Sequence, residues 1–222
     1  MKNAISLMVA VMSCMSLDFA MAQADKDFTA IVAKRDKAAV IDGVAGEGEY
    51  PAAVLTMKQT PAREDINGSP ASAKVFHDGK SLYVIITVPF KDGGNLSKGE
   101  QWVQDDAAEV CFCDASNTQA GPTFVIHGFA SGKHESTTDG SATEDAAEKL
   151  GKAVKYAAKI DKQSWTGEWA IPLEAAGLKY KPGMKLSFNL GAWRSEDAEW
   201  IIWCGAEGPT YQLENGGKLT LE

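Results

Sequence analysis

The stretch EQWVQDDAAEVCFCD, residues 100–114, is the part of the sequence on which the interpretation of the fold depends. After two adjacent aspartates, apolar residues alternate with a glutamate and two cysteines, which is the period-two pattern of a β-strand. The apolar set from Ala108 to Phe112 therefore shares one face, and Glu109 lies on the other face with the two cysteines. Trp102 stands in the loop before this strand, so an aromatic ring and a carboxylate are expected on the same side of a sheet.

The bulk composition indicates one folded domain of ordinary polarity. The chain has 222 residues, of which 45% are hydrophobic and 23% are charged, and this is enough to build a hydrophobic core. Its net charge of −8 disfavours nucleic acids and anionic membrane surfaces as partners.

Residues 1–24 have the pattern of a secretory signal peptide. Lys2 supplies the positive start, residues 4–17 form an apolar run that is too short to span a bilayer, and small residues around Ala22 suit cleavage. A lipid attachment at Cys14 fits the sequence less well. We therefore expect a secreted or periplasmic protein without a membrane span.

The remainder of the chain predicts an all-β fold. Residues 25–37 are polar and are expected to form a leader or a short helix, and residues 38–222 are expected to form the domain. Short β-prone runs separated by turn signals, without long helices, are typical of a jelly-roll-like antiparallel β-sandwich with one short helix, expected at residues 173–178. Residues 144–150 suit one or two helical turns within a surface excursion. The expected strands are 40–43, 52–58, 73–78, 81–89, 108–113, 122–130, 153–160, 165–171, 185–193, 199–204 and 217–221.

Three cysteines remain after cleavage, and their number leaves at least one without an intramolecular partner. Cys111 and Cys113 point the same way along one strand, so a bridge between them would be strained. An oxidising compartment permits Cys204 to pair with either of them, and the sequence does not choose between the two. The three thiols and His127 are also the candidates for a soft metal site, although their spacing lacks the usual paired loop pattern.

Several stretches together resemble a family 9 carbohydrate-binding module, part of a wider group of sandwich domains that includes the DOMON-type sugar and haem binders. The resemblance spans about residues 38–222. It is carried by Ile41-Asp42-Gly43 with Glu49-Tyr50, Val75 to Asp78 with Leu82-Tyr83-Val84, Trp102 with Asp106 and Glu109, Glu168-Trp169-Ala170-Ile171-Pro172-Leu173, Phe188-Asn189, and Gly217 to Leu221.

The resemblance implies that oligo- or polysaccharides bind between aromatic side chains. By position, Trp102 would be one wall of the clamp, Glu109 would hydrogen-bond to sugar hydroxyls, and Tyr211 is the nearest aromatic residue for the second wall. An arginine that contacts sugar in the family would fall near Val125. Such a clamp is physically reasonable, because the C–H faces of a pyranose stack on aromatic rings while carboxylates accept hydroxyl protons. Among the other tryptophans, Trp203 is the best candidate for an outward-facing ring.

Asp106 completes the candidate ligand-binding residues. No cofactor is predicted with certainty, and calcium is left open, with Asp105 and Asp106 as its candidate ligands and Asp114 as an assisting residue in another loop. Since the spacing is not that of a regular calcium loop, the alternative is that Asp106 caps the turn into the strand. Glu168, within the strand motif, is expected to make a structural hydrogen bond.

Two other functions remain open at this point. A haem b-binding redox module of the same broad fold would use His127 or a methionine, and a structural envelope domain is favoured if Trp102 is buried. An enzyme is not predicted, because no nucleophile motif, phosphate loop or paired carboxylates stand out.

Overall fold

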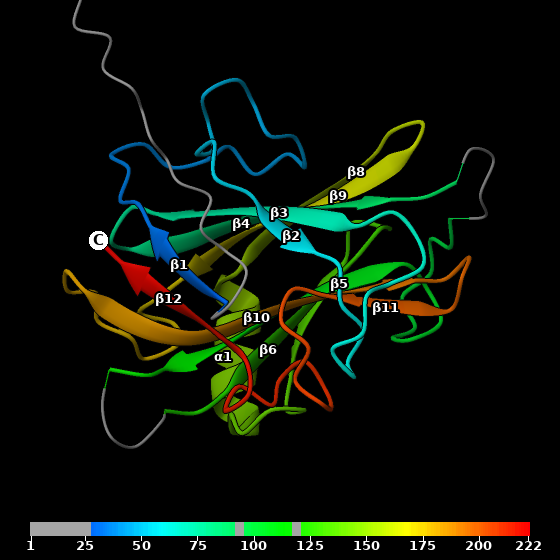
Figure 1. Cartoon of the computed structure of the whole chain (residues 1–222). Coiled ribbons are helices and arrows are strands. Elements are labelled where there is room, and N and C mark those ends of the chain that lie inside the picture. The colour runs from blue at the N-terminus through cyan, green and yellow to red at the C-terminus, as the bar shows by residue number, and fades with distance from the viewer. Residues whose placement is uncertain (1–27, 92–95, 117–120) are drawn as a thin grey trace, which may run out of the picture.

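Twelve strands and one helix form two facing β-sheets in this computed structural model, which describes residues 28–91, 96–116 and 121–222 (Figure 1). The first sheet has seven strands and the second has five. In spatial order the first contains β1 (Thr29–Val32), β12 (Gly217–Leu221), β10 (Met184–Arg194), β5 (Ala107–Asp114), β6 (Phe124–Phe129) and β7 (His134–Thr137), with β11 (Glu199–Ile202) also paired to β10. The second contains β2 (Leu55–Met57), β3 (Ala71–His77), β4 (Ser81–Pro89), β9 (Ser164–Pro172) and β8 (Lys155–Ile160). The all-β sandwich is confirmed.

The core lies between the sheets and is built from one face of each strand. On β5 the alternate residues Ala108, Val110 and Phe112 point into it, as the sequence pattern predicts. From the opposite sheet, β9 contributes Trp165 and Trp169, which are fully buried. Burial of such large apolar side chains supplies the main driving force for closing the two layers.

The central strand β4 is covered on both faces, as its nearly continuous apolar sequence predicts. Leu82 and its alternate neighbours face the core, whereas Tyr83 and Ile85 form a smaller cluster on the outer side with Phe76 and Tyr50. The rings of Phe76 and Tyr83 stack with centroids 4.6 Å apart. Residues 39–50 thus close the outer face of the five-stranded sheet.

Glu168 fastens this N-terminal cover to β9. The residue is fully buried, and its carboxylate accepts hydrogen bonds from the Asp42 amide at 2.9 Å, the Gly43 amide at 2.8 Å and the Tyr50 hydroxyl at 2.9 Å. The expected structural role is confirmed. The expected strand at residues 40–43 is wrong, because two backbone donors there bond to this side chain instead of to a neighbouring strand.

Two further expectations are corrected. Part of the expected leader, residues 29–32, forms β1, which pairs in parallel with β12 and so belongs to the seven-stranded sheet. Residues 173–178 form consecutive turns instead of a helix, with hydrogen bonds three residues apart, for example from the Ala176 amide to the Leu173 carbonyl at 3.1 Å. Gly177, at φ +72°, ends them in the left-handed region that glycine adopts without strain.

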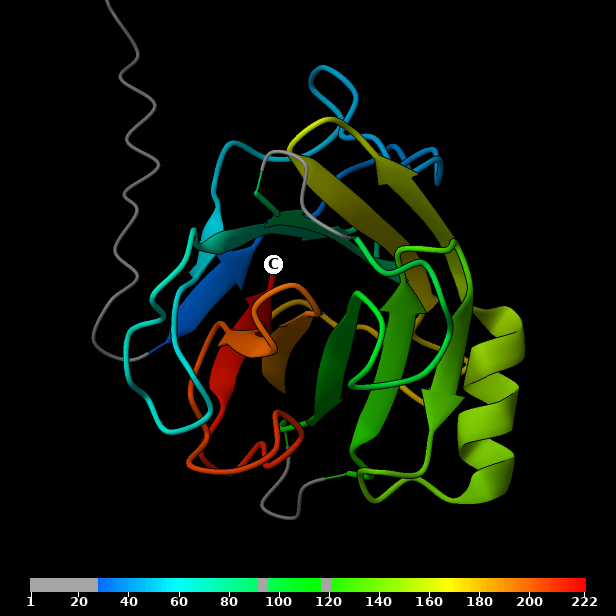
Figure 2. The ribbon, with the colours of Figure 1, turned by 90° about the vertical axis from the view of Figure 1, so that its right-hand side faces the viewer.

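The one helix of the described residues lies in the surface excursion. Helix α1 (Glu144–Ala153) begins at Thr143, whose side chain accepts a hydrogen bond from the Ala146 amide, and it has acidic residues in its first turn. Figure 2 shows that α1 packs along the edge of the sandwich beside β7, a strand that the sequence pattern did not predict.

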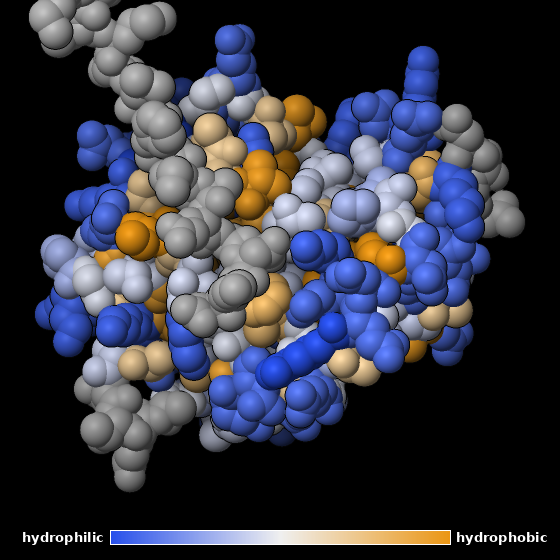
Figure 3. Space-filling view, in the orientation of Figure 1, coloured by the Kyte–Doolittle hydropathy of each residue, from blue (hydrophilic) through white to orange (hydrophobic). Residues whose placement is uncertain are grey.

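The visible surface in Figure 3 is mostly hydrophilic, with small and separate apolar patches. Within the described residues, no helix is long and apolar enough to cross a bilayer. The expected signal peptide, residues 1–24, lies outside the described part of the chain.

Replacing Glu168 with alanine is expected to lower the free energy of unfolding by about 3 kcal/mol, because three donors, two of them in buried hydrogen bonds, lose their acceptor at once. Urea unfolding followed by tryptophan fluorescence measures this change. The control is Glu174→Ala, which removes an exposed carboxylate just beyond β9 and should cost no more than about 0.5 kcal/mol. Equal midpoints for the two variants would show that Glu168 is not the anchor described above.

Candidate functional site

The outer face of the seven-stranded sheet carries a row of residues that strand pairing places side by side. Glu109 on β5 is opposite Gly191 on β10 and opposite His127 on β6, while Gly191 also faces Ile202 on β11 and His127 faces Glu135 on β7. Side chains directly opposite one another in a sheet point to the same face. The sequence pattern correctly placed Glu109 on the non-core side of β5.

Gly191 leaves the space that Glu109 occupies. A Cβ atom at this position would meet Oε1 of Glu109 at 2.9 Å and Oγ1 of Thr210 at 3.0 Å. Both contacts are tighter than side chains ordinarily make. The absence of a side chain on β10 therefore lets a carboxylate and a hydroxyl from two separate elements approach the same point.

The loop from Cys204 to Gly216 covers part of this face, and Asn189 on β10 holds it there. The fully buried amide of Asn189 donates to the carbonyl oxygens of Cys204 at 2.8 Å and Thr210 at 3.2 Å, and its oxygen accepts from the Cys204 amide at 3.1 Å. These bonds fix the stretch that carries Thr210 and Tyr211. Buried backbone groups need such partners, so the loop gains its position from one side chain.

The loop that carries Trp102 is held by the two aspartates that follow it. Asp105 accepts hydrogen bonds from the Ser97 hydroxyl and from the Gln101 amide, the latter at 2.7 Å. These bonds hold the pKa of Asp105 below its ordinary value. Val103, next to the tryptophan, has φ +62°, a conformation that is rare for a β-branched residue and that the surrounding bonds must enforce.

Asp106 fastens the same loop to the turn between β10 and β11. Its buried carboxylate accepts from the Ser97 amide at 2.7 Å and from the Ser195 hydroxyl at 2.5 Å. Asp106 does not line the cavity described below; its bonds position the loop that carries Trp102, which agrees with the capping alternative. Asp114 lies at the opposite end of β5, where it caps its own turn through the Ser116 amide at 2.8 Å.

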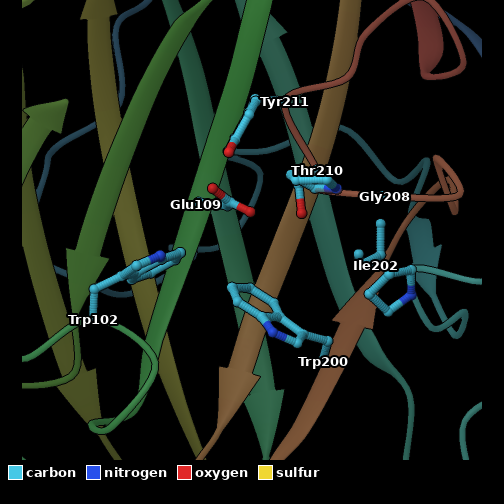
Figure 4. Close-up of a pocket in the computed structure, with 9 residues that line it drawn as sticks. Trp102, Glu109, Trp200, Ile202, Gly208, Thr210 and Tyr211 are labelled. Atoms are coloured by element: carbon cyan, nitrogen blue, oxygen red, sulfur yellow. The ribbon is translucent and has the colours of Figure 1, made fainter. Parts of the chain in front are cut away.

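These elements surround a cavity of about 310 Å³. Figure 4 shows Glu109 between the indoles of Trp102 and Trp200 on one side and Tyr211 on the other. The two indoles meet at 63° with centroids 5.4 Å apart, which forms a corner of two aromatic faces. Thr210 and Pro61 add to the wall. The cavity therefore combines ring surfaces, one buried carboxylate and two hydroxyls, which is the usual composition of a small-ligand site.

His127 lies beneath Trp102 and between carboxylates. The two rings are nearly parallel, with centroids 3.5 Å apart and 9° between their planes. Nδ1 of His127 is 3.0 Å from Glu135, and Nε2 is 3.6 Å from Glu109. Burial lowers the pKa of His127, but the Glu109 and Glu135 carboxylates outweigh it, so the net pKa is raised above the ordinary value near 6.5.

The structure brings together three of the four expected ligand-binding residues: Trp102, Glu109 and Tyr211. Trp200 is the aromatic wall that the sequence reasoning missed, and Trp203, the expected outward-facing ring, is instead buried in the core. The alternation on β11 separates Trp200 and Ile202 from Ile201, but both faces are apolar, so the pattern could not say which one faces the cavity.

The three cysteines of the described residues are free, and the pairing of Cys204 with Cys111 or Cys113 that the sequence favoured is wrong. Cys111 and Cys113 pack on the outer face with Val125, Leu213 and part of Tyr211, whereas Cys204 belongs to the core cluster. Val125, at the position where the family resemblance placed an arginine, is fully buried in this cluster. Burial raises the pKa of each thiol, which keeps them protonated.

Neither metal nor haem binding gains support from the geometry. The described residues contain no group of three or more histidine, cysteine or acidic side chains arranged to hold a metal ion. The His127 ring is covered by Trp102, and both of its nitrogens face carboxylates, so an axial bond to haem iron would displace these contacts. Met57 and Met184 are buried in the core.

The sequence pattern of the carbohydrate family 9 binding domain-like family matches residues 41–221. The chain belongs to this family. No curated protein gives a significant match to the sequence.

Solved structures of this family 9 fold align over most of the chain. A carbohydrate-binding module from Caldicellulosiruptor kristjanssonii in complex with glucose has a TM-score of 0.62 and 16% identity, over 87% of this chain and 95% of its own. A family 9 module from the same organism in complex with cellotriose has a TM-score of 0.61 and 15% identity, over 87% of this chain and 93% of its own. A Bacteroides uniformis ATCC 8492 protein, assigned provisionally as carbohydrate-binding, has a TM-score of 0.64 and 15% identity, over 89% of this chain and 100% of its own. At this identity the matches establish the shared fold.

The stability that His127 contributes is expected to decrease as pH rises. Because its pKa is higher in the folded than in the unfolded protein, the folded state binds more protons, and the contribution is complete below about pH 6.5. It is lost as pH rises through the folded-state pKa. Urea unfolding at a series of pH values should show the difference between wild type and His127→Gln shrinking with rising pH.

The control for this measurement is His134→Gln, which alters a half-buried histidine on β7 whose Nε2 lies 3.1 Å from the Gly151 carbonyl. This variant should keep the pH dependence of the wild type. A difference between wild type and His127→Gln that stayed constant or grew with pH would contradict the charge network described above.

Proposed function

We propose that this family 9 protein binds saccharides in the cavity between Trp102, Trp200 and Tyr211. The observation that carries the proposal is the combination of an aromatic corner with the Glu109 carboxylate, which is only 3% exposed yet lines the cavity. A pyranose ring can lie flat on one indole while its hydroxyl groups donate to the carboxylate. The glucose and cellotriose complexes of the Caldicellulosiruptor module support the same class of ligand.

The protein is proposed to be a non-catalytic binder. Hydrolysis of a glycosidic bond ordinarily needs two carboxyl groups on either side of the bond. Glu109 is the one carboxyl group among the nine described residues that line the cavity. This composition supports holding a sugar, not cleaving one.

Export and an accessory role in glycan degradation complete the proposal. The signal-peptide pattern of residues 1–24 supports a secreted or periplasmic protein, and polysaccharides are found outside the cytoplasm. A binder of this kind would keep its ligand close to enzymes that degrade it.

Tryptophan fluorescence titration with soluble gluco-, xylo- and manno-oligosaccharides tests sugar binding. A saturable change is expected with at least one series, and both Trp102→Ala and Trp200→Ala should weaken binding about tenfold or more, because each removes one face of the corner. Tyr180→Ala serves as the control, since this half-buried aromatic residue packs against His77 away from the cavity. No response across the series from folded wild-type protein would refute the proposal.

A further inference from the structure

The cavity carries more negative charge than a site for neutral sugars requires. Within the described residues the Glu109 carboxylate has only weak donors near it: Nε2 of His127 at 3.6 Å, longer than an ordinary hydrogen bond, and the thiol of Cys111 on the same strand. A buried carboxylate ordinarily gains several donors to offset its loss of water. Glu109 is therefore left with accepting capacity, and Figure 4 shows its oxygens at the cavity.

One imidazole cannot balance the carboxylates around it. Besides Glu109, the His127 ring faces Glu135 at 3.0 Å and Asp139 at 3.9 Å, so three negative charges meet at most one positive charge. Glu135 and Asp139 are about half exposed, which screens their effect, but Glu109 is not exposed in this way. The other ring element packed on His127, Trp102, brings no charge.

No basic side chain on the cavity wall offsets this surplus. Neither lysine nor arginine is among the nine described lining residues. Arg63, two residues beyond the lining residue Pro61, donates to the Gly205 carbonyl at 2.7 Å and pairs with Glu207 at 3.5 Å. The electrostatic potential at the cavity is therefore negative, and burial together with Asp139 and Glu109 accordingly raises the pKa of Tyr211.

The negative potential favours a cationic ligand, and the two indoles strengthen this preference. The face of an indole attracts cations, and the attraction grows where water is excluded. Trp102 and Trp200 present such faces within the cavity that Glu109 lines. A ligand with a positive charge would thus be stabilised by the carboxylate and by the rings, whereas a neutral hydroxyl gains only the hydrogen bond.

We propose that the cavity selects saccharides that carry a protonated amino group, namely hexosamine units, over neutral sugars of the same shape and over uronic acids. The inference rests on the proposed function, because it assigns the ligand class of that same cavity. The ammonium group would donate to Glu109 while the pyranose ring lies on the aromatic corner.

Isothermal titration at low salt, at a pH at which the amine is protonated, compares matched disaccharides. The β-1,4-linked disaccharide of glucosamine is expected to bind about tenfold more tightly than cellobiose. Its N-acetylated form, which lacks the charge, should lose this advantage, and a glucuronic acid disaccharide should bind most weakly. Salt at 0.5 M should reduce the advantage of the amine and leave cellobiose binding nearly unchanged.

Glu109→Gln keeps the shape of the side chain and removes its charge, so it should abolish the preference for the amine. Glu174→Gln, an exposed carboxylate outside the cavity, should keep it. If Glu109→Gln does not fold, the salt dependence and the N-acetylated ligand decide the question in wild-type protein.

The outcomes separate the two proposals. Equal affinity for the amine and for cellobiose, or a preference that persists in folded Glu109→Gln, overturns the inference and leaves saccharide binding in place. Binding to none of these disaccharides or of the neutral oligosaccharides overturns the proposed function as well.

Discussion

The register between β5, β6 and β10 is the constraint on which both the core and the candidate site depend. Because side chains alternate along each strand, pairing Glu109 with Gly191 and His127 sends Ala108, Val110 and Phe112 into the core at the same time. A slip of one residue would bury the carboxylate among the core tryptophans and expose the apolar set. The free energy gained by forming the core therefore also positions the site.

The site needs support beyond this row, and two buried polar side chains provide it by fixing the loops. Asn189 holds the strand-to-loop segment that carries Tyr211, and Asp106 holds the loop that carries Trp102. Both residues make bonds to backbone amides or carbonyls, so the loops have fixed positions without being part of a sheet. Glu168 uses the same device on the other side of the sandwich. Because these hydrogen bonds fix the loops before a ligand arrives, less conformational entropy is lost when a ligand binds.

The sequence predicted the strands with strong alternation and the residues that share their faces. It placed Glu109 opposite the core, and the family resemblance placed Trp102 and Tyr211 in one site. Prediction from the sequence failed where contacts with residues far along the chain decide the local structure. Residues 40–43 have strand propensity, but Glu168, more than a hundred residues away, takes their amides. Trp200 and Trp203 lie on an apolar strand and just beyond it, so only the packing of the sheets shows which ring faces the core.

The charge of the site follows from elements that no local pattern connects. Glu109, His127 and Glu135 come from three strands, and Asp139 comes from the loop after β7. Val125 packs with Cys111 and Cys113 on the outer face, and the nearby Glu109 carboxylate has no lysine or arginine beside it on the cavity wall. Shape and charge can therefore vary separately on this fold, because the rings come from two loops and β11, whereas the charged groups come from β5, β6, β7 and the loop after β7.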